Sequence, residues 1–106
     1  MESRLAVVIL PTGNMDIVKL IKKLGNQYLV EVTIDREVLK LEGHTRIVPI
    51  TKSILIEEFR LINILPSSIE IVNELIDDKH YEVYNLDNNK GRYMTIEELS
   101  KLTDAF

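Results

Sequence analysis

The sequence RIVPITKSILIEEFRLINIL (residues 46–65) concentrates the apolar residues of the chain, and we expect the other segments to pack around it. Apolar residues between positions 54 and 65 fall on all sides of a helical wheel, so a helix here would have no polar face. In a strand, Leu55, Phe59 and Leu61 share one face and the isoleucines occupy the other, as in a strand covered on both sides. The pattern therefore favours a strand over a helix for residues 54–64.

Charged residues and a proline limit this strand. Glu57, Glu58 and Arg60 interrupt both faces at once, which indicates an exposed strand end or a bend. Pro49 has no N–H to donate to a strand ladder, so it marks an edge strand or the end of the preceding strand.

The N-terminal part of the chain predicts a strand, a turn and a helix. Residues 5–10, LAVVIL, form a short apolar run that predicts a buried strand, and residues 11–14, PTGN, predict a turn. Asn14 is a good helix N-cap residue, and Gly25 can end a helix. The apolar residues between them recur at helical spacing: Ile17, Leu20, Ile21 and Leu24. We therefore predict a helix over residues 14–24.

Residues 27–50 predict an antiparallel meander of three strands. Apolar residues alternate from Tyr28 to Ile34, residues 35–36 can form a tight connection to residues 38–41, and Gly43 marks a second reversal before residues 46–50.

Two further helices are expected in the C-terminal half. Ser67 and Glu70 have the spacing of a capping box before an apolar stripe, which predicts a helix over residues 67–77. Thr95 and Glu98 form a second such box and predict a helix at the end of the chain. Between these helices, residues 81–85 and 92–94 predict a hairpin with a polar turn.

Taken together, the pattern predicts an α+β fold that forms one domain over residues 1–106. It consists of an N-terminal β-α-β unit, a three-stranded meander and a C-terminal hairpin in a mainly antiparallel sheet, with about three helices packed on it. The opening strand–helix–strand order resembles part of the ferredoxin-like topology, although the extra hairpins depart from it.

Composition narrows the classes of function. The chain has 106 residues, 45% hydrophobic and 28% charged, and no cysteine, so disulfides, thiolate metal sites and cysteine nucleophiles are excluded. No apolar run approaches the roughly 20 residues needed to cross a bilayer. No signal pattern precedes the domain, so we expect a cytoplasmic protein without membrane contact.

The two halves of the chain differ in charge. Residues 1–53 hold eight basic and six acidic residues, and residues 54–106 hold five and eleven. The acidic half disfavours nucleic-acid binding, since phosphates need cationic partners. The opposite charges indicate either solvated surfaces or a contribution to subunit association.

The turn before the predicted helix is a candidate anion site. Thr12, Gly13 and Asn14 could present main-chain N–H groups to a phosphate or carboxylate at the helix N-terminus. The turn lacks the residues of a P-loop or a dinucleotide fingerprint, so an ordinary capped turn explains it equally.

The sequence DNNKGRYMTIEEL (residues 87–99) resembles part of an EF-hand calcium loop. Asp87, Asn89 and Glu98 match the first, third and twelfth ligand positions, and the resemblance implies a metal site at these residues. Arg92 stands where that loop requires glycine, and no helix precedes it. A polar hairpin turn followed by a capped helix explains the same residues.

Cations and aromatic rings alternate across the predicted C-terminal hairpin. Aromatic rings can stack on bases while cations neutralise phosphates, so these residues could contact nucleic acid. Cross-strand packing is the alternative. The candidates are Lys79, Tyr81, Lys90, Arg92 and Tyr93.

No motif supplies a nucleophile, a metal cluster or a cofactor loop, so we expect no cofactor and, more readily than an enzyme, a non-enzymatic protein. Apolar residues are abundant enough to leave a surface patch once the core is filled. The sequence therefore predicts a small protein-interaction or regulatory module that self-associates, as a homodimer, through a sheet edge or an apolar helix face. A nucleic-acid-binding accessory protein is the first alternative, and an enzyme whose site is assembled from dispersed polar residues is the second.

Overall fold

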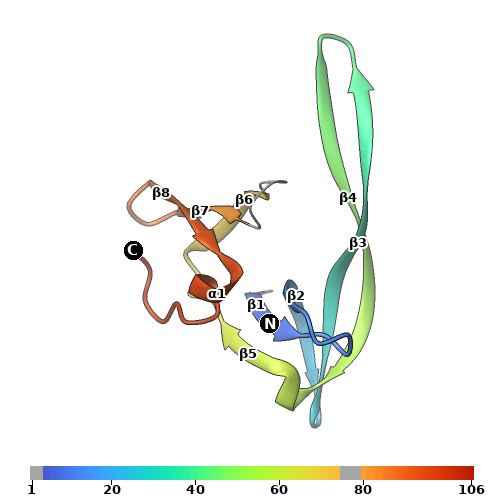
Figure 1. Ribbon diagram of the computed structural model, residues 1–106, viewed down its shortest axis with the longest axis vertical. Helices are drawn as coiled ribbons and strands as arrows, with labels where there is room; N and C mark the ends of the chain where they lie inside the picture. The colour runs from blue at the N-terminus through green and yellow to red at the C-terminus, as the bar shows by residue number, and fades with distance from the viewer. Residues whose placement is uncertain (1–3, 75–79) are drawn as a thin grey trace.

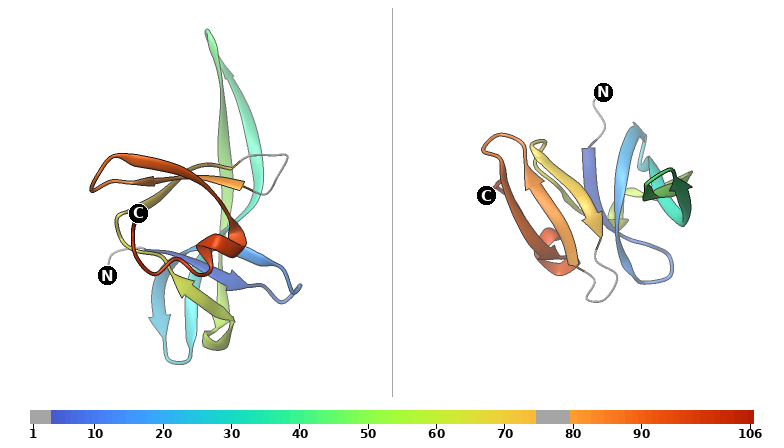
Figure 2. Two further views of the ribbon diagram at one scale, coloured as in Figure 1. Left: turned by 60° about the vertical axis from the view of Figure 1, so that its left-hand side comes forward. Right: turned by 90° about the horizontal axis from the view of Figure 1, so that it is seen from above.

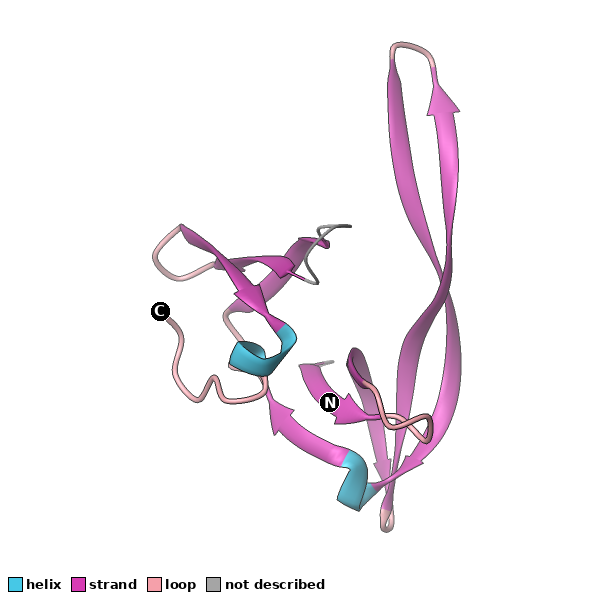
Figure 3. Ribbon diagram, in the orientation of Figure 1, coloured by secondary structure: helices cyan, strands magenta, loops and turns pink. Residues whose placement is uncertain are grey.

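The computed structural model describes residues 4–74 and 80–106, and antiparallel strands make up most of them (Figures 1 and 3). The first sheet has five strands in the order β4-β3-β2-β1-β5, and the second has three in the order β6-β7-β8. The first sheet comprises β1 (Arg4–Ile9), β2 (Met15–Leu24), β3 (Gln27–Leu41), β4 (His44–Glu57) and β5 (Leu61–Ile64). The second comprises β6 (Ile69–Glu74), β7 (His80–Asn85) and β8 (Lys90–Thr95). Two short helical segments complete the fold: the 3-10 turn η1 (Glu58–Arg60) and α1 (Ile96–Leu99).

The predicted α+β class with about three helices is therefore wrong. The helix expected over residues 14–24 is strand β2, and the one expected over residues 67–77 is strand β6 in its described part. In β2, Val18 and Leu20 face one core while Met15 and Ile17 face another. A strand buried on both faces carries apolar residues at odd and at even positions. In so short a segment, such a set of positions includes the i, i+3, i+4 spacing of an apolar helix face. In β6, by contrast, Ile69 and Ile71 alternate with exposed residues, as in a strand buried on one face.

The third predicted helix is present, although it is one turn long. The Thr95 hydroxyl accepts a hydrogen bond from the Glu98 N–H at 3.2 Å, and the Glu98 carboxylate accepts one from the Thr95 N–H at 3.1 Å. This reciprocal pair is the capping box that the sequence indicated.

The predicted strand over residues 54–64 is confirmed in two parts. Strand β4 ends at Glu57, η1 forms the bend at the charged residues, and β5 continues from Leu61. Pro49 lies in β4, an edge strand of the first sheet. This position suits proline, which has no main-chain N–H to donate to a second neighbouring strand. The predicted connection at residues 35–36 is wrong, because β3 runs through it with only a register shift between Thr33 and Asp35. The expected three-stranded meander is thus one long two-stranded hairpin, which reverses at Gly43 with φ +87°.

The first sheet curls around its own core. In a flat sheet the edge strands of five would lie about 19 Å apart, given a spacing of about 4.8 Å between strands. Ile54 of β4 and Leu61 of β5 nevertheless pack against the same buried cluster. The residues of that cluster are Ala6, Val8, Val18, Leu20, Val30, Val32 and Ile56.

A second core lies on the other face of β1, where the small sheet and α1 pack (Figure 2). Val7 points into this second core and is fully buried, whereas its neighbours Ala6 and Val8 are buried in the first. Strand β1 is therefore covered on both sides, which is why residues 5–10 read as a continuous apolar run. The buried residues of the second core are Val7, Leu65, Ile69, Val83, Met94, Ile96 and Leu99.

The outer part of the β3–β4 hairpin leaves the body of the protein as a projecting ribbon (Figure 1). We call this ribbon, residues 33–51, the arm. A β-bulge between Thr33 and Asp35 marks where it begins, and bulges of this kind bend and twist a strand. All residues from Thr33 to Thr45 are exposed, and the longest dimension of the molecule is 47 Å. Both core clusters lie outside the arm.

Candidate interaction surface

The arm presents two different faces, because residues opposite one another in an antiparallel ladder share a face and successive residues alternate. We call the first the leucine face. Its described side chains are Asp35, Glu37, Leu39 and Leu41 of β3 with His44, Val48 and Ile50 of β4. We call the second the valine face. Its described side chains are Arg36, Val38 and Lys40 of β3 with Thr45 and Pro49 of β4.

Large apolar side chains on the arm are open to solvent. On the leucine face, Leu39 is 38% exposed, Leu41 48% and Ile50 40%, while Val38 on the valine face is 58% exposed. A two-stranded ribbon is at best marginally stable in water when it stands alone. The arm therefore holds exposed apolar side chains on an element that has no core of its own, which makes it the candidate interaction surface.

The free edge of the arm is poorly suited to pairing with another strand. The turn Glu42–Gly43 makes a two-residue hairpin loop, so Leu41 and His44 form a hydrogen-bonded pair and the pair types alternate from there. Pro49, opposite Arg36, then falls at a position whose main-chain N faces away from β3. Because proline has no N–H, the free edge of β4 lacks a donor midway along the arm, a known device against strand addition.

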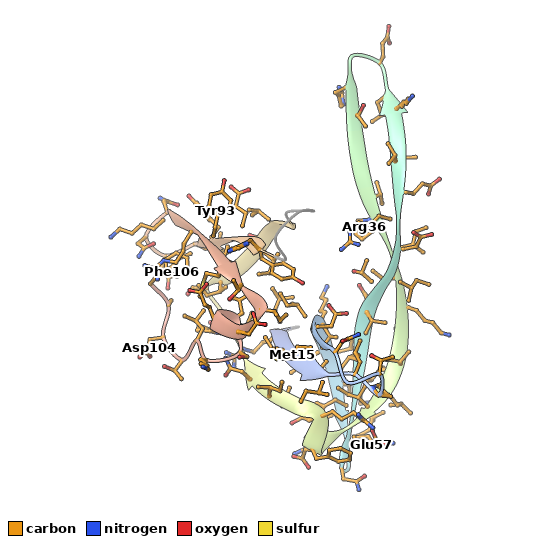
Figure 4. All side chains as sticks on the ribbon, in the orientation of Figure 1. Met15, Arg36, Glu57, Tyr93, Asp104 and Phe106 are labelled. Carbon is orange, nitrogen blue, oxygen red and sulfur yellow. The ribbon has the colours of Figure 1, made fainter. Side chains whose placement is uncertain are left out.

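A small electrostatic cluster lies where the arm leaves the body. Burial raises the pKa of Asp16 above its ordinary value, and the hydrogen bond from the Ile17 N–H (2.8 Å) and the charge of Arg36 offset only part of this effect. Burial and the charge of Asp16 likewise raise the pKa of Tyr81 on β7. Figure 4 shows Arg36 extending from the arm on the side of the small sheet. Asp16 of β2, Arg36 of the arm and Tyr81 of the small sheet are therefore close enough for their charges to affect one another's ionisation.

We expect Asp16→Asn to stabilise the protein at neutral pH. A raised carboxyl pKa means that the fold disfavours the ionised form, so Asp16 costs stability as pH rises through the interval above its ordinary pKa, and the full cost is present at pH 7. Asparagine keeps an oxygen for the Ile17 N–H and removes that cost. The gain should be a few tenths to about 1 kcal/mol, since the carboxyl is only half-buried.

Urea unfolding midpoints at pH 7 and pH 3 measure this gain in stability. The gain should vanish at pH 3, where the Asp16 carboxyl is protonated and the side chain at position 16 carries no charge in either protein. The matched control is Asp35→Asn, because the exposed Asp35 accepts the same kind of hydrogen bond from the next N–H (2.8 Å). An equal gain for both substitutions, or a gain that persists at pH 3, would contradict the explanation.

The predicted anion site lies in a hairpin turn rather than before a helix. Strands β1 and β2 flank Thr12, Gly13 and Asn14. The Gly13 N–H donates to the Leu10 carbonyl at 2.8 Å, and the Leu10 N–H donates to the Asn14 carbonyl at 2.9 Å. The turn thus lacks the helix N-terminus that would favour an anion, and the Gly13 N–H is used within the turn.

Two of the predicted nucleic-acid contacts are engaged within the protein. The Arg92 guanidinium lies over the Phe106 ring at 4.6 Å from its centre, and Tyr81 packs against the second core. Lys90 and Tyr93 are exposed on β8, and Lys79 lies outside the described residues. Figure 4 shows where Tyr93 lies on the small sheet. Of the four candidates that the structure describes, two are therefore exposed, and both lie on one strand.

The residues that resemble a calcium loop are not brought together. Glu98 serves the capping box, whose hydrogen bonds from Thr95 lower the pKa of Glu98, while Asn89 accepts a hydrogen bond from the Tyr84 hydroxyl at 3.1 Å. The six residues of β8, about 20 Å of extended chain, separate the turn holding Asp87 and Asn89 from Glu98. Over residues 4–74 and 80–106, no three histidine, aspartate or glutamate side chains cluster as metal ligands would.

The apolar arm residues were the ones that sequence reasoning missed as a site, since it assigned them to strands of the core sheet. One signal was present. Apolar residues alternate from Val30 to Ile34, whereas Val38, Leu39 and Leu41 occupy both odd and even positions and are mixed with charges. Such loss of alternation is typical of a ribbon without a buried side.

Within the part of the chain that the structure describes, no helix has the length and apolarity to span a membrane. Comparison with known proteins identifies no relative: no family model matches the chain, and neither a curated protein nor a solved structure matches it.

Proposed function

We propose that this protein is a non-enzymatic protein-interaction module that self-associates through the arm. The observation that carries the proposal is the set of solvent-exposed apolar side chains on a two-stranded projection without contact to either core. Covering those side chains removes apolar area from water, which is the main favourable term in protein association.

Charge supports a second copy as the partner. The whole chain has a net charge of −4, so two bodies repel one another. The arm is neutral, because its three acidic residues match its three basic residues, and two copies can approach one another there without that repulsion. The charged residues of the arm are Asp35, Glu37 and Glu42 with Arg36, Lys40 and Arg46.

Shortening the arm tests the proposal. Asp35 and Ile50 are ladder partners, so replacing residues 36–49 by Asn-Gly closes the hairpin with a two-residue turn of a favoured type. We expect the full-length chain to be a dimer by light scattering coupled to size-exclusion chromatography. The shortened variant should be a monomer with a thermal midpoint close to that of the full chain, since both cores are retained.

The matched control is Glu42→Asn, which introduces the same Asn-Gly turn while keeping the arm, and it should remain dimeric. A full-length chain that is monomeric at high concentration, or a shortened variant that still dimerises, would overturn the proposal. Absorbance at 260 and 280 nm in the same run addresses the nucleic-acid alternative. The chain has no tryptophan and four tyrosines, so a 260 nm excess that disappears in high salt would favour that alternative.

A further inference from the structure

We propose, building on the self-association above, that two copies pack their leucine faces together with the arms antiparallel, about a two-fold axis that crosses the middle of the arms. A closed dimer of identical chains uses the same surface on both copies, so the surface must be complementary to itself. The arm is complementary to itself when two leucine faces meet and the arms run antiparallel.

The leucine face is the better of the two for this contact. It carries four described apolar side chains, two on each strand: Leu39, Leu41, Val48 and Ile50. The valine face carries the cations Arg36 and Lys40 and, among its described side chains, fewer large apolar residues, so it offers less apolar area to a partner. Because Pro49 interrupts the free edge, the copies meet through side chains rather than through strand addition.

The distribution of charge along the arm favours the antiparallel orientation. The half nearer the body, residues 33–37 and 48–51, contains Asp35, Arg36 and Glu37 and has a net charge of −1. The outer half, residues 38–47, contains Lys40, Glu42 and Arg46 and has a net charge of +1 with neutral histidine. Antiparallel arms set each outer half against the partner's inner half, so opposite charges meet, whereas parallel arms set like charges together.

The size of the arm points to full overlap. Eight ladder pairs join Thr33–Leu41 to His44–Thr51, which gives a ribbon about 24 Å long and about 10 Å wide. One face then projects to about 240 Å², whereas a stable dimer buries about 800 Å² on each partner. A contact between arm tips alone is far too small. Full antiparallel overlap uses the whole face and so buries the largest area that the arm can offer.

Cysteine cross-linking tests the arrangement, because the chain has no cysteine and each introduced thiol is therefore unique. The three positions are polar, exposed and on the leucine face: Glu37 near its middle, His44 at its outer end and Asp35 at its inner end. With a short bis-maleimide, Glu37→Cys should cross-link to itself. His44→Cys and Asp35→Cys should each fail alone and cross-link when the two proteins are mixed.

The outcomes separate the arrangement from self-association itself. Efficient self-cross-linking of His44→Cys would show that the arms meet at their tips or run parallel, and would overturn the antiparallel arrangement while self-association stands. A dimer by light scattering in which none of the three variants cross-links would also overturn the antiparallel arrangement and leave self-association standing. A monomer by light scattering for the unmodified chain would instead reject the proposed function. A cross-link in the mixture, with neither variant reacting alone, supports the arrangement.

Discussion

The double substitution Leu39→Asp and Leu41→Asp is expected to raise the dissociation constant of the dimer by about three orders of magnitude. The two leucines are 38% and 48% exposed, so association should bury about half of each side chain, worth about 1 kcal/mol apiece. Four such side chains per dimer give about 4 kcal/mol, or about 1000-fold in affinity. Sedimentation equilibrium over a range of concentrations measures the constant directly.

The control is Val38→Asp, which places the same residue type in the same strand on the valine face, and it should change the dissociation constant only a few-fold. A comparison variant, Leu39→Lys with Leu41→Lys, should weaken the dimer less than the aspartates do. In antiparallel arms the new lysines face the inner half of the partner, whose net charge is negative, while new aspartates are repelled there. Equal effects of the two double substitutions would contradict the antiparallel orientation, and a large effect of Val38→Asp would contradict the packing of the leucine faces.

The second large effect is expected at Val7, the residue of β1 that points into the core between the two sheets. Val7 has no exposed surface, and Val7→Asp would bury a carboxyl group among apolar residues. The cost should exceed about 4 kcal/mol, a large share of the 5–15 kcal/mol by which domains of this size are usually stable. We therefore expect Val7→Asp to be unfolded or close to it at 25 °C by near-ultraviolet circular dichroism and urea unfolding.

Ile9→Asp provides the matched control, because Ile9 lies two residues further along the same strand and is 40% exposed. Its cost should stay within about 1 kcal/mol, since a solvated aspartate needs no buried partner. If Val7→Asp were as stable as Ile9→Asp, the small sheet and α1 could not be packed on that face of β1.

Local residue chemistry accounts for the parts of the fold that were predicted correctly. The bend after Glu57 follows from three charged residues that neither face of a buried strand accepts. Gly43 marks the reversal of the long hairpin because its φ of +87° suits glycine best. The capping box at Thr95 and Glu98 involves residues three apart, so its hydrogen bonds depend little on the rest of the chain.

The failures concern segments whose state depends on distant partners. The apolar residues of β2 suit a helix with one apolar stripe as well as a strand buried on both faces, and those of β6 suit such a helix as well as a strand buried on one face. Only pairing decided between them: β2 lies between β1 and β3, and β6 pairs with β7. A backbone that pairs with a neighbouring strand gains a ladder of hydrogen bonds and at least one covered face, and this tertiary gain outweighs local helical preference.

The candidate surface could not be predicted from the sequence, for a related reason. Residues 27–50 indicated strands, but alternation does not tell whether a strand continues past its neighbours. β3 and β4 extend well beyond β2, and the bulge after Thr33 turns their outer part away from the core. The sequence by itself thus determined the turns at residues 11–14 and at Gly43, the cap, the strand character of residues 54–64 and the abundance of apolar residues. Tertiary structure alone decided which of those residues remain exposed, because burial depends on the elements that cover a strand and these come from elsewhere in the chain.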